Sequence, residues 1–403
     1  MTQRNRPGAL AQLSNDTMQQ AEGPSHADIR EAVRRLCGRF DGAYWQVLDR
    51  ERAYPAAFVK ALTDDGYLSI LIPEAYGGAG LPLAAAAAVL EEIHRSGGNG
   101  AACHAQMYTM GALLRHGSDE QKRRWLPQIA AGTLRLQAFA VTEPDAGVDT
   151  SRIATTARLE GDSYLVSGRK IWISRAEHSD LMLLLCRTRP RDEAHPTRGM
   201  SLLLVEMKDA VGKGLTIRPV RTMLNHATTE LFFDELKVPA GNLIGAEGEG
   251  FRHVLDGMNA ERILIAAECI GDGRFFVDRA TAYANQREVF GGPIGRNQGV
   301  QFPIARAYVQ IEAAAGMVER AAGLFDAGRK CGTEANMAKM LASEASWFAA
   351  DVCLQTHGGF GFAEEYDIER KFRETRLYQT APIPTNLILS HVATHALGLP
   401  KSF

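Results

Sequence analysis

No apolar run in this 403-residue sequence is long enough to cross a membrane. The longest runs, at 181–186 and 83–90, fall far short of the ~20 residues that a helix needs to span a bilayer. The first 25 residues contain no apolar block, so the sequence predicts neither a membrane anchor nor a secretory signal. We expect a flexible tail at residues 1–25, because Gly, Pro, Ser, Asn and Gln occur there without periodicity.

Cysteine is scarce and never occurs in a CxxC pair. This spacing supports neither a disulfide framework nor a zinc site. We therefore expect no bound metal, and a reducing compartment, the cytoplasm, as the location of the protein. The six cysteines are Cys37, Cys103, Cys186, Cys269, Cys331 and Cys353.

An excess of charge of either sign is also missing. Lys and Arg number 45 and Asp and Glu number 47, which gives a net charge of −2. This balance predicts no nucleic-acid partner. Apolar residues make up 45% and charged residues 23% of the chain, as in an ordinary globular protein. The length suggests two or three domains.

The spacing of apolar residues divides the chain into three blocks, which we predict to be domains. From 26 to 136 apolar residues recur three and four apart, and Ser118 followed by acidic residues indicates a helix start. From 137 to 246 short segments rich in Val, Ile, Thr and Leu predict the strands of a small barrel or sandwich. The block from 247 to 403 is typical of a helical bundle. Its long helices are expected at 251–285, 301–327 and 333–357.

Several common catalytic and cofactor motifs are absent. The sequence contains no Walker A, HExxH or GxSxG motif. No GxGxxG motif lies between an expected strand and an expected helix, so a Rossmann nicotinamide site has no support.

Five segments, in chain order, resemble the signatures of the acyl-CoA dehydrogenase flavoproteins. The segments extend over roughly residues 28–398 at the family's spacing. The resemblance implies an α+β fold with an N-terminal α-helical domain, a middle β-barrel domain and a C-terminal four-helix bundle. This agrees with the three blocks described above. The segments are Ala140–Asp149, Gly168–Ser174, Arg287–Gly291 followed by Gln298, Gln355–Phe362, and Arg373 with Arg376.

The resemblance also implies chemistry and partners. Family members bind FAD and desaturate an acyl-CoA between Cα and Cβ, as in the β-oxidation of fatty acids. Their electrons pass to an electron-transfer flavoprotein. Most members are homotetramers built as dimers of dimers.

The residues expected to bind FAD are the positions that match family motifs. Trp172 would form an aromatic wall for the isoalloxazine ring, and Ser174 would hydrogen-bond the flavin near N5. Arg287 would bind the pyrophosphate through its fixed donor fork, together with Phe290, from the neighbouring subunit. The other expected FAD contacts are Phe139, Val141, Thr142, Gly147, Val148, Ile173, Gln298, Gln355, Gly358, Gly359 and Asn386.

Several of these residues have a purely structural alternative. Trp172 and Thr142 could be ordinary strand residues, and the adjacent glycines at 358–359 could be only a helix C-cap. Arg287 could be a surface residue near a helix end. Val148 departs from the family, because many relatives have a serine there for contacts with FAD and the thioester chain. Only the backbone amide of Val148 could make such contacts.

The catalytic base must be a carboxylate in a dry pocket, where burial raises its pKa towards the working pH. In most of the family this glutamate lies in a C-terminal Y-E-G-T motif, but Pro382 occupies that position here. A minority, including isovaleryl-CoA and long-chain acyl-CoA dehydrogenases, has the glutamate on an earlier helix, directly before an arginine. Glu261 and Arg262 match that arrangement.

Helical spacing supports Glu261 without the family. A carboxylate on an apolar stripe is either paired or functional. Glu268 lies two turns further along the same stripe and is the rival base. The resemblance makes Arg262, Asn259 and Val148 the expected substrate contacts. The neighbours of Glu261 three and four positions away are Gly257, Met258, Leu264 and Ile265.

Two other functions remain open from the sequence. The usual glutamate is also lost in family members that do not desaturate, such as acyl-CoA desulfinases and flavin oxygenases. A flavin-binding protein without turnover is the third alternative. The sequence does not specify the length, branching or aromatic character of the acyl chain.

Overall fold

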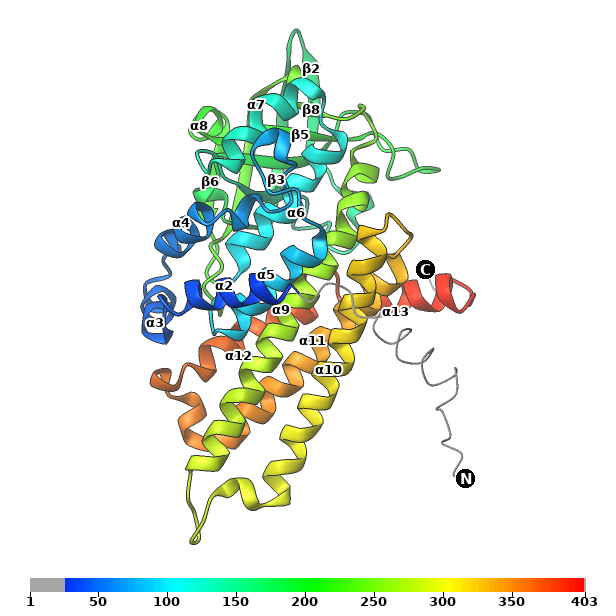
Figure 1. Ribbon diagram of the computed structural model, residues 1–403. Helices are drawn as coiled ribbons and strands as arrows, with labels where there is room; N and C mark the ends of the chain where they lie inside the picture. The colour runs from blue at the N-terminus through cyan, green and yellow to red at the C-terminus, as the bar shows by residue number, and fades with distance from the viewer. Residues whose placement is uncertain (1–25, 402–403) are drawn as a thin grey trace, which may run out of the picture.

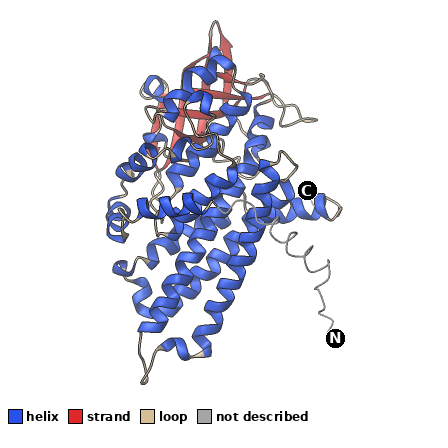
Figure 2. Cartoon of the chain, viewed as in Figure 1, coloured by secondary structure: helices blue, strands red, loops and turns tan. Residues whose placement is uncertain are grey.

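The computed structural model describes residues 26–401, so the tail predicted at residues 1–25 lies outside the described part. The elements follow the predicted order of helices, strands and helices along the chain (Figure 1). The strands gather at one end of the molecule and the long helices extend away from them (Figure 2). Among the described residues, no helix is long and apolar enough to cross a membrane.

Six helices form the N-terminal block. Ser118 begins the last of them with a capping box, because its hydroxyl accepts from the Gln121 amide and the Gln121 side chain accepts from the Ser118 amide. Pro127 lies within this helix. The helices are α2 (Ala27–Cys37), α3 (Gly42–Glu51), α4 (Ala56–Asp64), α5 (Leu83–Arg95), α6 (Ala101–His116) and α7 (Asp119–Ala130).

Eight strands form one mixed sheet in the order β6-β7-β3-β2-β4-β5-β8, with β1 paired to β4. The strand β4 is buried on both faces. Leu183 and Leu185 pack in a core that includes Trp125 of α7, whereas Met182 and Leu184 belong to the core on the other side. The elements are β1 (Leu136–Ala140), β2 (Thr156–Glu160), β3 (Ser163–Ser174), β4 (Leu181–Arg187), β5 (Met200–Glu206), α8 (Met207–Ala210), β6 (Leu215–Pro219), β7 (Thr228–Pro239) and β8 (Leu243–Ile244).

Three long helices dominate the C-terminal block, close to their predicted bounds. The first of them, α9, has 37 residues. It packs against α10 and α11 and also against α5 and α6, so α9 joins the two helical blocks. The helices are α9 (Gly250–Gln286), α10 (Gln298–Asp326), α11 (Gly332–His357), α12 (Ile368–Arg376) and α13 (Thr385–His391).

Candidate active site

A pocket, with about 250 Å³ of empty space including its solvent-filled mouth, lies where α9 crosses α6 and the sheet. Glu261 is the carboxylate in its wall, and Tyr108 of α6 and Phe139 of β1 lie beside it. The two rings contact each other edge to face, with 6.0 Å between their centroids. Most other wall atoms are apolar. The residues that complete the lining are Thr109, Ala112, Leu183, His253, Val254, Gly257 and Met258.

Glu261 is only 8% exposed. Burial raises the pKa of its carboxyl to about 7, and the nearby charge of Arg262 opposes this rise only in part. A carboxyl group with this pKa is a base at neutral pH and also holds a proton readily. These are the properties that general base catalysis needs.

Arg262 and Asn259, the two predicted substrate residues on α9, lie together. The Arg262 Nη1 donates to the Asn259 Oδ1 at 3.0 Å. The buried Nε of Arg262 has no partner among the described residues, so the guanidinium keeps donors for a ligand. Val148, the third predicted substrate residue, lies in a different loop and is 61% exposed.

Glu268, the rival base, lies in a saturated network. Its Oε1 is 2.8 Å from His104 Nδ1, and its Oε2 accepts from the Tyr378 hydroxyl at 2.8 Å. Burial by itself would raise the pKa of Glu268, but His104, His94 and the Tyr378 hydroxyl outweigh it and the pKa falls to about 2. The carboxylate is therefore fully ionised and is not available to a substrate.

Trp172 is presented by an irregularity in β3. The sequence predicts two strands at 164–166 and 170–173, but they form one strand whose register against β7 shifts twice. The second shift coincides with Trp172, which has a left-handed φ of 63° and is 58% exposed. Such bulges re-aim side chains. The indole ring of Trp172 therefore lies on the surface of the sheet and not in its core.

Ile173 and Ser174 differ in what they can offer a flavin. Ile173 is buried in the sheet core, and its carbonyl accepts from the Thr229 hydroxyl at 2.7 Å. Its side chain therefore faces away from any ligand at Trp172. Ser174 is half-buried at the end of β3, where a hydroxyl can reach a bound ring.

A buried ion pair fixes the predicted flavin segment after β1. The Lys170 Nζ donates to the Val141 carbonyl at 2.7 Å and to Glu143 Oε1 at 2.9 Å. Glu143 also accepts from the amides of Ala154 and Thr155. Glu143 is therefore a structural residue. This clamp positions Val141 and the half-buried Thr142 beside β3.

The remaining predicted FAD residues have the open surroundings that a large ligand needs. A Cβ added at Gly147, Gly358 or Gly359 would meet nothing within 4 Å. Phe290 is 96% exposed and has a left-handed φ of 53°. Arg287 lies over the Phe360 ring, 5.8 Å from its centroid. Gln298 and Gln355 are exposed at the start of α10 and near the end of α11.

These residues form two separate groups within one chain. Glu261 is on α9 near the sheet, whereas Arg287 directly follows the last residue of α9. The helical rise of 1.5 Å per residue puts the two about 39 Å apart. Arg287, Phe290 and Gly358 thus lie too far from Glu261 to share one flavin with it. A second copy of the chain can bring such groups together.

Pro382 and Asn386 lie outside both groups. Pro382, half-buried, follows Ala381 in the segment before α13 and does not line the Glu261 pocket. Asn386 is exposed on α13. The structure does not bring Asn386 to the other predicted FAD residues of its own chain.

Sequence reasoning missed three residues at the site. Tyr108 and His253 line the Glu261 pocket, and Arg175 is buried directly after Ser174. Only Arg175 had a usable signal, since it continues the recognised segment.

The fold and this set of residues define a class of protein, the flavoprotein oxidoreductases with a buried carboxylate. The open aromatic and glycine positions fit FAD.

Comparison with known proteins agrees with this class of protein. Residues 23–133, 138–236 and 248–396 match the acyl-CoA dehydrogenase N-terminal, middle and C-terminal domains. An acyl-CoA dehydrogenase of Mycobacterium bovis is 34% identical over 385 residues, 95% of this chain and 98% of the relative. The chain belongs to the acyl-CoA dehydrogenase family, whose members are oxidoreductases.

Solved structures share the whole fold. A glutaryl-coenzyme A dehydrogenase in complex with glutaryl-CoA superposes with a TM-score of 0.87 and 31% identity, covering 94% of this chain and 97% of that one. The structure of PigA with FAD and proline also gives a TM-score of 0.87, at 25% identity, covering 94% of this chain and 98% of that one.

Proposed function

We propose that this protein is an acyl-CoA dehydrogenase that uses Glu261 as its base and forms a trans-2-enoyl-CoA. The observation that carries the proposal is the carboxyl of Glu261, buried in a largely apolar pocket with a pKa of about 7. It would belong to the subgroup whose base precedes the arginine on α9. The saturated network around Glu268 supports Glu261 over its rival.

The reaction divides between the chain and its cofactor. The Glu261 carboxylate takes the α-proton of the thioester, and the apolar wall formed by Phe139 and Met258 excludes water from that proton. Arg262 and Asn259 bind the CoA portion. The cofactor is FAD, which supplies the acceptor for the β-hydride at its N5 when it is bound.

The cofactor site follows from the same residues. Trp172 forms the wall beside the isoalloxazine ring, and Ser174 and Thr142 supply hydroxyls. The backbones of Val141, Gly147, Val148 and Ile173 complete this half of the site, with Phe139 at its border. The other half comes from the partner copy, and its residues are Arg287, Phe290, Gln298, Gln355, Gly358, Gly359 and Asn386.

We further propose a homotetramer, a dimer of dimers, that passes electrons to an electron-transfer flavoprotein. The distance between the two groups of site residues supports an assembly of copies. So does a set of exposed apolar residues on α10, Phe302, Tyr308 and Val309. The exposed Trp172 offers a route for electrons leaving the flavin.

The remaining proposals concern the domain limits, the location of the protein and its pathway. The domain limits 26–136, 137–246 and 247–403 follow the change from helices to strands and back. The cytoplasm is the proposed location and fatty-acid β-oxidation the proposed pathway. All six cysteines are buried and unpaired, which supports a reducing compartment.

The experiment is an anaerobic titration of the yellow holoenzyme with straight, branched and aromatic acyl-CoAs, followed by the flavin absorbance. We expect one class of thioester to bleach the flavin in the wild type. The Glu261→Gln variant should keep FAD but lose at least roughly 10³-fold in the reduction rate, because no other base is in place. A Glu261→Gln variant that is still bleached at the wild-type rate would exclude Glu261 as the base.

A further inference from the structure

A second pocket, with about 460 Å³ of empty space including its solvent-filled mouth, lies between the N-terminal helices and the sheet. Arg175, which follows β3, contributes the guanidinium group to its wall, and His226 and Tyr54 lie around it. Two carboxylates, Asp49 and Glu374, also line this cavity. Both carboxylates are therefore candidate counter-ions for Arg175.

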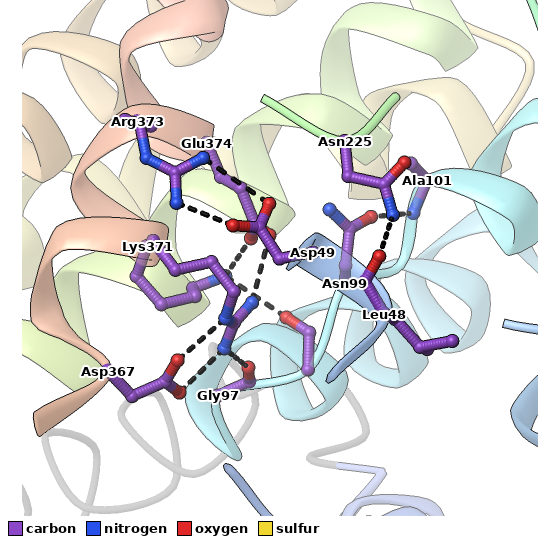
Figure 3. Close-up of polar contacts among 12 residues, drawn as sticks. Leu48, Asp49, Gly97, Asn99, Ala101, Asn225, Asp367, Lys371, Arg373 and Glu374 are labelled. Carbon is purple, nitrogen blue, oxygen red and sulfur yellow. Dashed lines mark hydrogen bonds and ion pairs between the residues drawn. The ribbon is translucent and has the colours of Figure 1, made fainter. Parts of the chain in front are cut away.

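Both carboxylates are already paired. Asp49 accepts a bidentate pair of bonds from Arg373, with Nη2 2.6 Å from Oδ2 and Nη1 3.3 Å from Oδ1 (Figure 3). Glu374 accepts from Arg370 at 2.8 Å and from Lys371 at 3.1 Å. Neither carboxylate makes an ion pair with Arg175.

Arg175 is a buried cation that makes no ion pair with a carboxylate among the described residues. The residue is 5% exposed, and its Nε has no partner in that part of the chain. Burial lowers the pKa of its guanidinium, and the nearby Tyr108, Tyr54 and Glu268 oppose this only in part and without a hydrogen bond. Removing a charge from water without pairing it is strongly unfavourable. The backbone adds strain, since its φ of 58° lies in the left-handed region that side chains such as arginine disfavour.

A second unpartnered polar atom faces the same cavity. The Nδ1 of His226 is buried and has no partner among the described residues. Burial and then the charge of Arg175 lower the pKa of His226 to about 3, so the imidazole is neutral. In the tautomer with its proton on Nδ1, it can donate to a ligand in the cavity. The Tyr54 hydroxyl, in contrast, is bonded to Gln137 Oε1 at 3.0 Å. The free groups around the cavity therefore suit an anion.

Tyr108 connects this cavity to the Glu261 pocket. The phenol lies in the Glu261 pocket wall. Helix α6 borders both pockets, because Ala102 lines the second one and Tyr108 lines the Glu261 pocket. Six residues of helix separate them, which is about 9 Å. An acyl chain whose α-carbon is at Glu261 can thus direct its far end past Tyr108 towards Arg175.

We propose that Arg175 binds a carboxylate at the far end of the acyl chain, so that the substrate class is the ω-carboxyacyl thioesters. The inference rests on the proposed function, because it assumes that the thioester lies at Glu261. A planar carboxylate matches the fixed donor fork of a guanidinium. It also gives the buried charge a direct ion pair, which the described residues do not provide.

The test uses the holoenzyme and pairs of S-alkyl-CoA thioethers of equal chain length, one ending in a methyl group and the other in a carboxylate. A thioether has no thioester carbonyl and cannot be desaturated, so binding is measured without turnover. Titration calorimetry gives each Kd. We expect the wild type to bind the carboxylate-ended thioether roughly 10- to 100-fold more tightly than its methyl-ended partner.

Two variants connect that preference to Arg175. Arg175→Asn should abolish the preference, so that the two thioethers bind with similar Kd, and it should still fold, since asparagine accepts the left-handed backbone. Arg175→Lys should keep part of the preference, because the charge remains without the fork. A wild type without the preference, or a preference that survives in Arg175→Asn, overturns the inference.

The same proteins distinguish a substrate contact of Arg175 from a flavin contact, and the carboxylate site from the proposed dehydrogenation. If the wild type shows no preference and Arg175→Asn loses its FAD, the flavin is the partner of Arg175 and the inference fails. If the preference holds but no acyl-CoA bleaches the flavin, the proposed dehydrogenation fails while the carboxylate site stands.

Discussion

Glu261 and Glu268 lie two turns apart on α9, but the pKa of the first is about 7 and the pKa of the second about 2. Both are buried in the same helix, so burial does not separate them. The difference comes from partners, because His104 and Tyr378 hydrogen-bond Glu268 and nothing comparable among the described residues holds Glu261. One carboxylate is fixed as an anion, and the other can exchange a proton.

The first prediction concerns the pH dependence of flavin reduction. Glu261 must be ionised to accept a proton, so the reduction rate at low substrate should rise through pH 7 and level off above it. Stopped-flow absorbance between pH 5.5 and 9 measures this. A rate that is already flat from pH 5.5 upward would contradict Glu261 as the titrating group.

The second prediction concerns the effect of Glu261 on the free energy of unfolding at different pH values. A raised carboxyl pKa means that the folded state binds the proton more tightly than the unfolded state, so stability falls as pH rises from about 4.5 to about 7. Glu261→Gln removes this penalty. At pH 8 the variant should be more stable than the wild type by about 1–3 kcal/mol, and below pH 4.5 the two should coincide. Urea unfolding at both pH values, with the exposed Glu319→Gln as control, decides this.

The third prediction concerns Glu268, whose effect on the free energy of unfolding is opposite to that of Glu261. The lowered pKa of Glu268 contributes stability that is present above about pH 4.5 and is lost as pH falls towards about 2. Glu268→Gln should therefore destabilise the protein at pH 7 by about 2–4 kcal/mol, partly because His104 and Tyr378 lose their shared partner. The deficit should shrink as pH falls below 4.5. Equal stability of variant and wild type at pH 7 would show that the network is not needed.

The fourth prediction concerns the clamp behind the flavin segment. Lys170→Met leaves Glu143 buried without its cation and frees the Val141 carbonyl, so we expect a loss of about 3–5 kcal/mol in unfolding free energy. FAD content should fall in parallel, because the 141–142 segment is no longer held. Lys213→Met is the matched control, since its exposed side chain lies 3.7 Å from Asp209 and should change stability by less than about 0.5 kcal/mol. Normal FAD content in the Lys170→Met variant would show that FAD binding does not depend on the contacts of Lys170 with Glu143 and Val141.

Much of this site could be predicted from the sequence, but its partners could not. The apolar neighbours of Glu261 on a 3.6-residue period predict its burial, and the burial is confirmed. The same period gives Glu268 the same environment. The groups that distinguish them, His104 and Tyr378, are 164 and 110 residues away from Glu268 in the sequence, and no local pattern connects them.

Backbone irregularities are a second limit. The residues typical of strands at 164–166 and 170–173 predict two short strands, and a tryptophan in such a segment is usually part of the strand core. The register shift that exposes Trp172 depends on pairing with β7, which lies far along the chain. Arg175 was missed for a related reason. Whether a buried guanidinium has a counter-ion depends on which carboxylates the fold has already paired with other cations.

The last prediction tests whether one active site needs two chains. Glu261→Gln lacks the base but keeps the second group of FAD residues, whereas Arg287→Ala keeps the base and lacks the arginine that the proposal assigns to the neighbouring FAD. Each variant alone should be inactive. When the two are unfolded, mixed and refolded, each mixed pair contains one site with both wild-type residues, so about a quarter of the wild-type activity should return. Refolding each variant alone is the control. If activity does not return in mixtures that contain FAD-bound mixed oligomers, Arg287 does not complete the site of a partner copy.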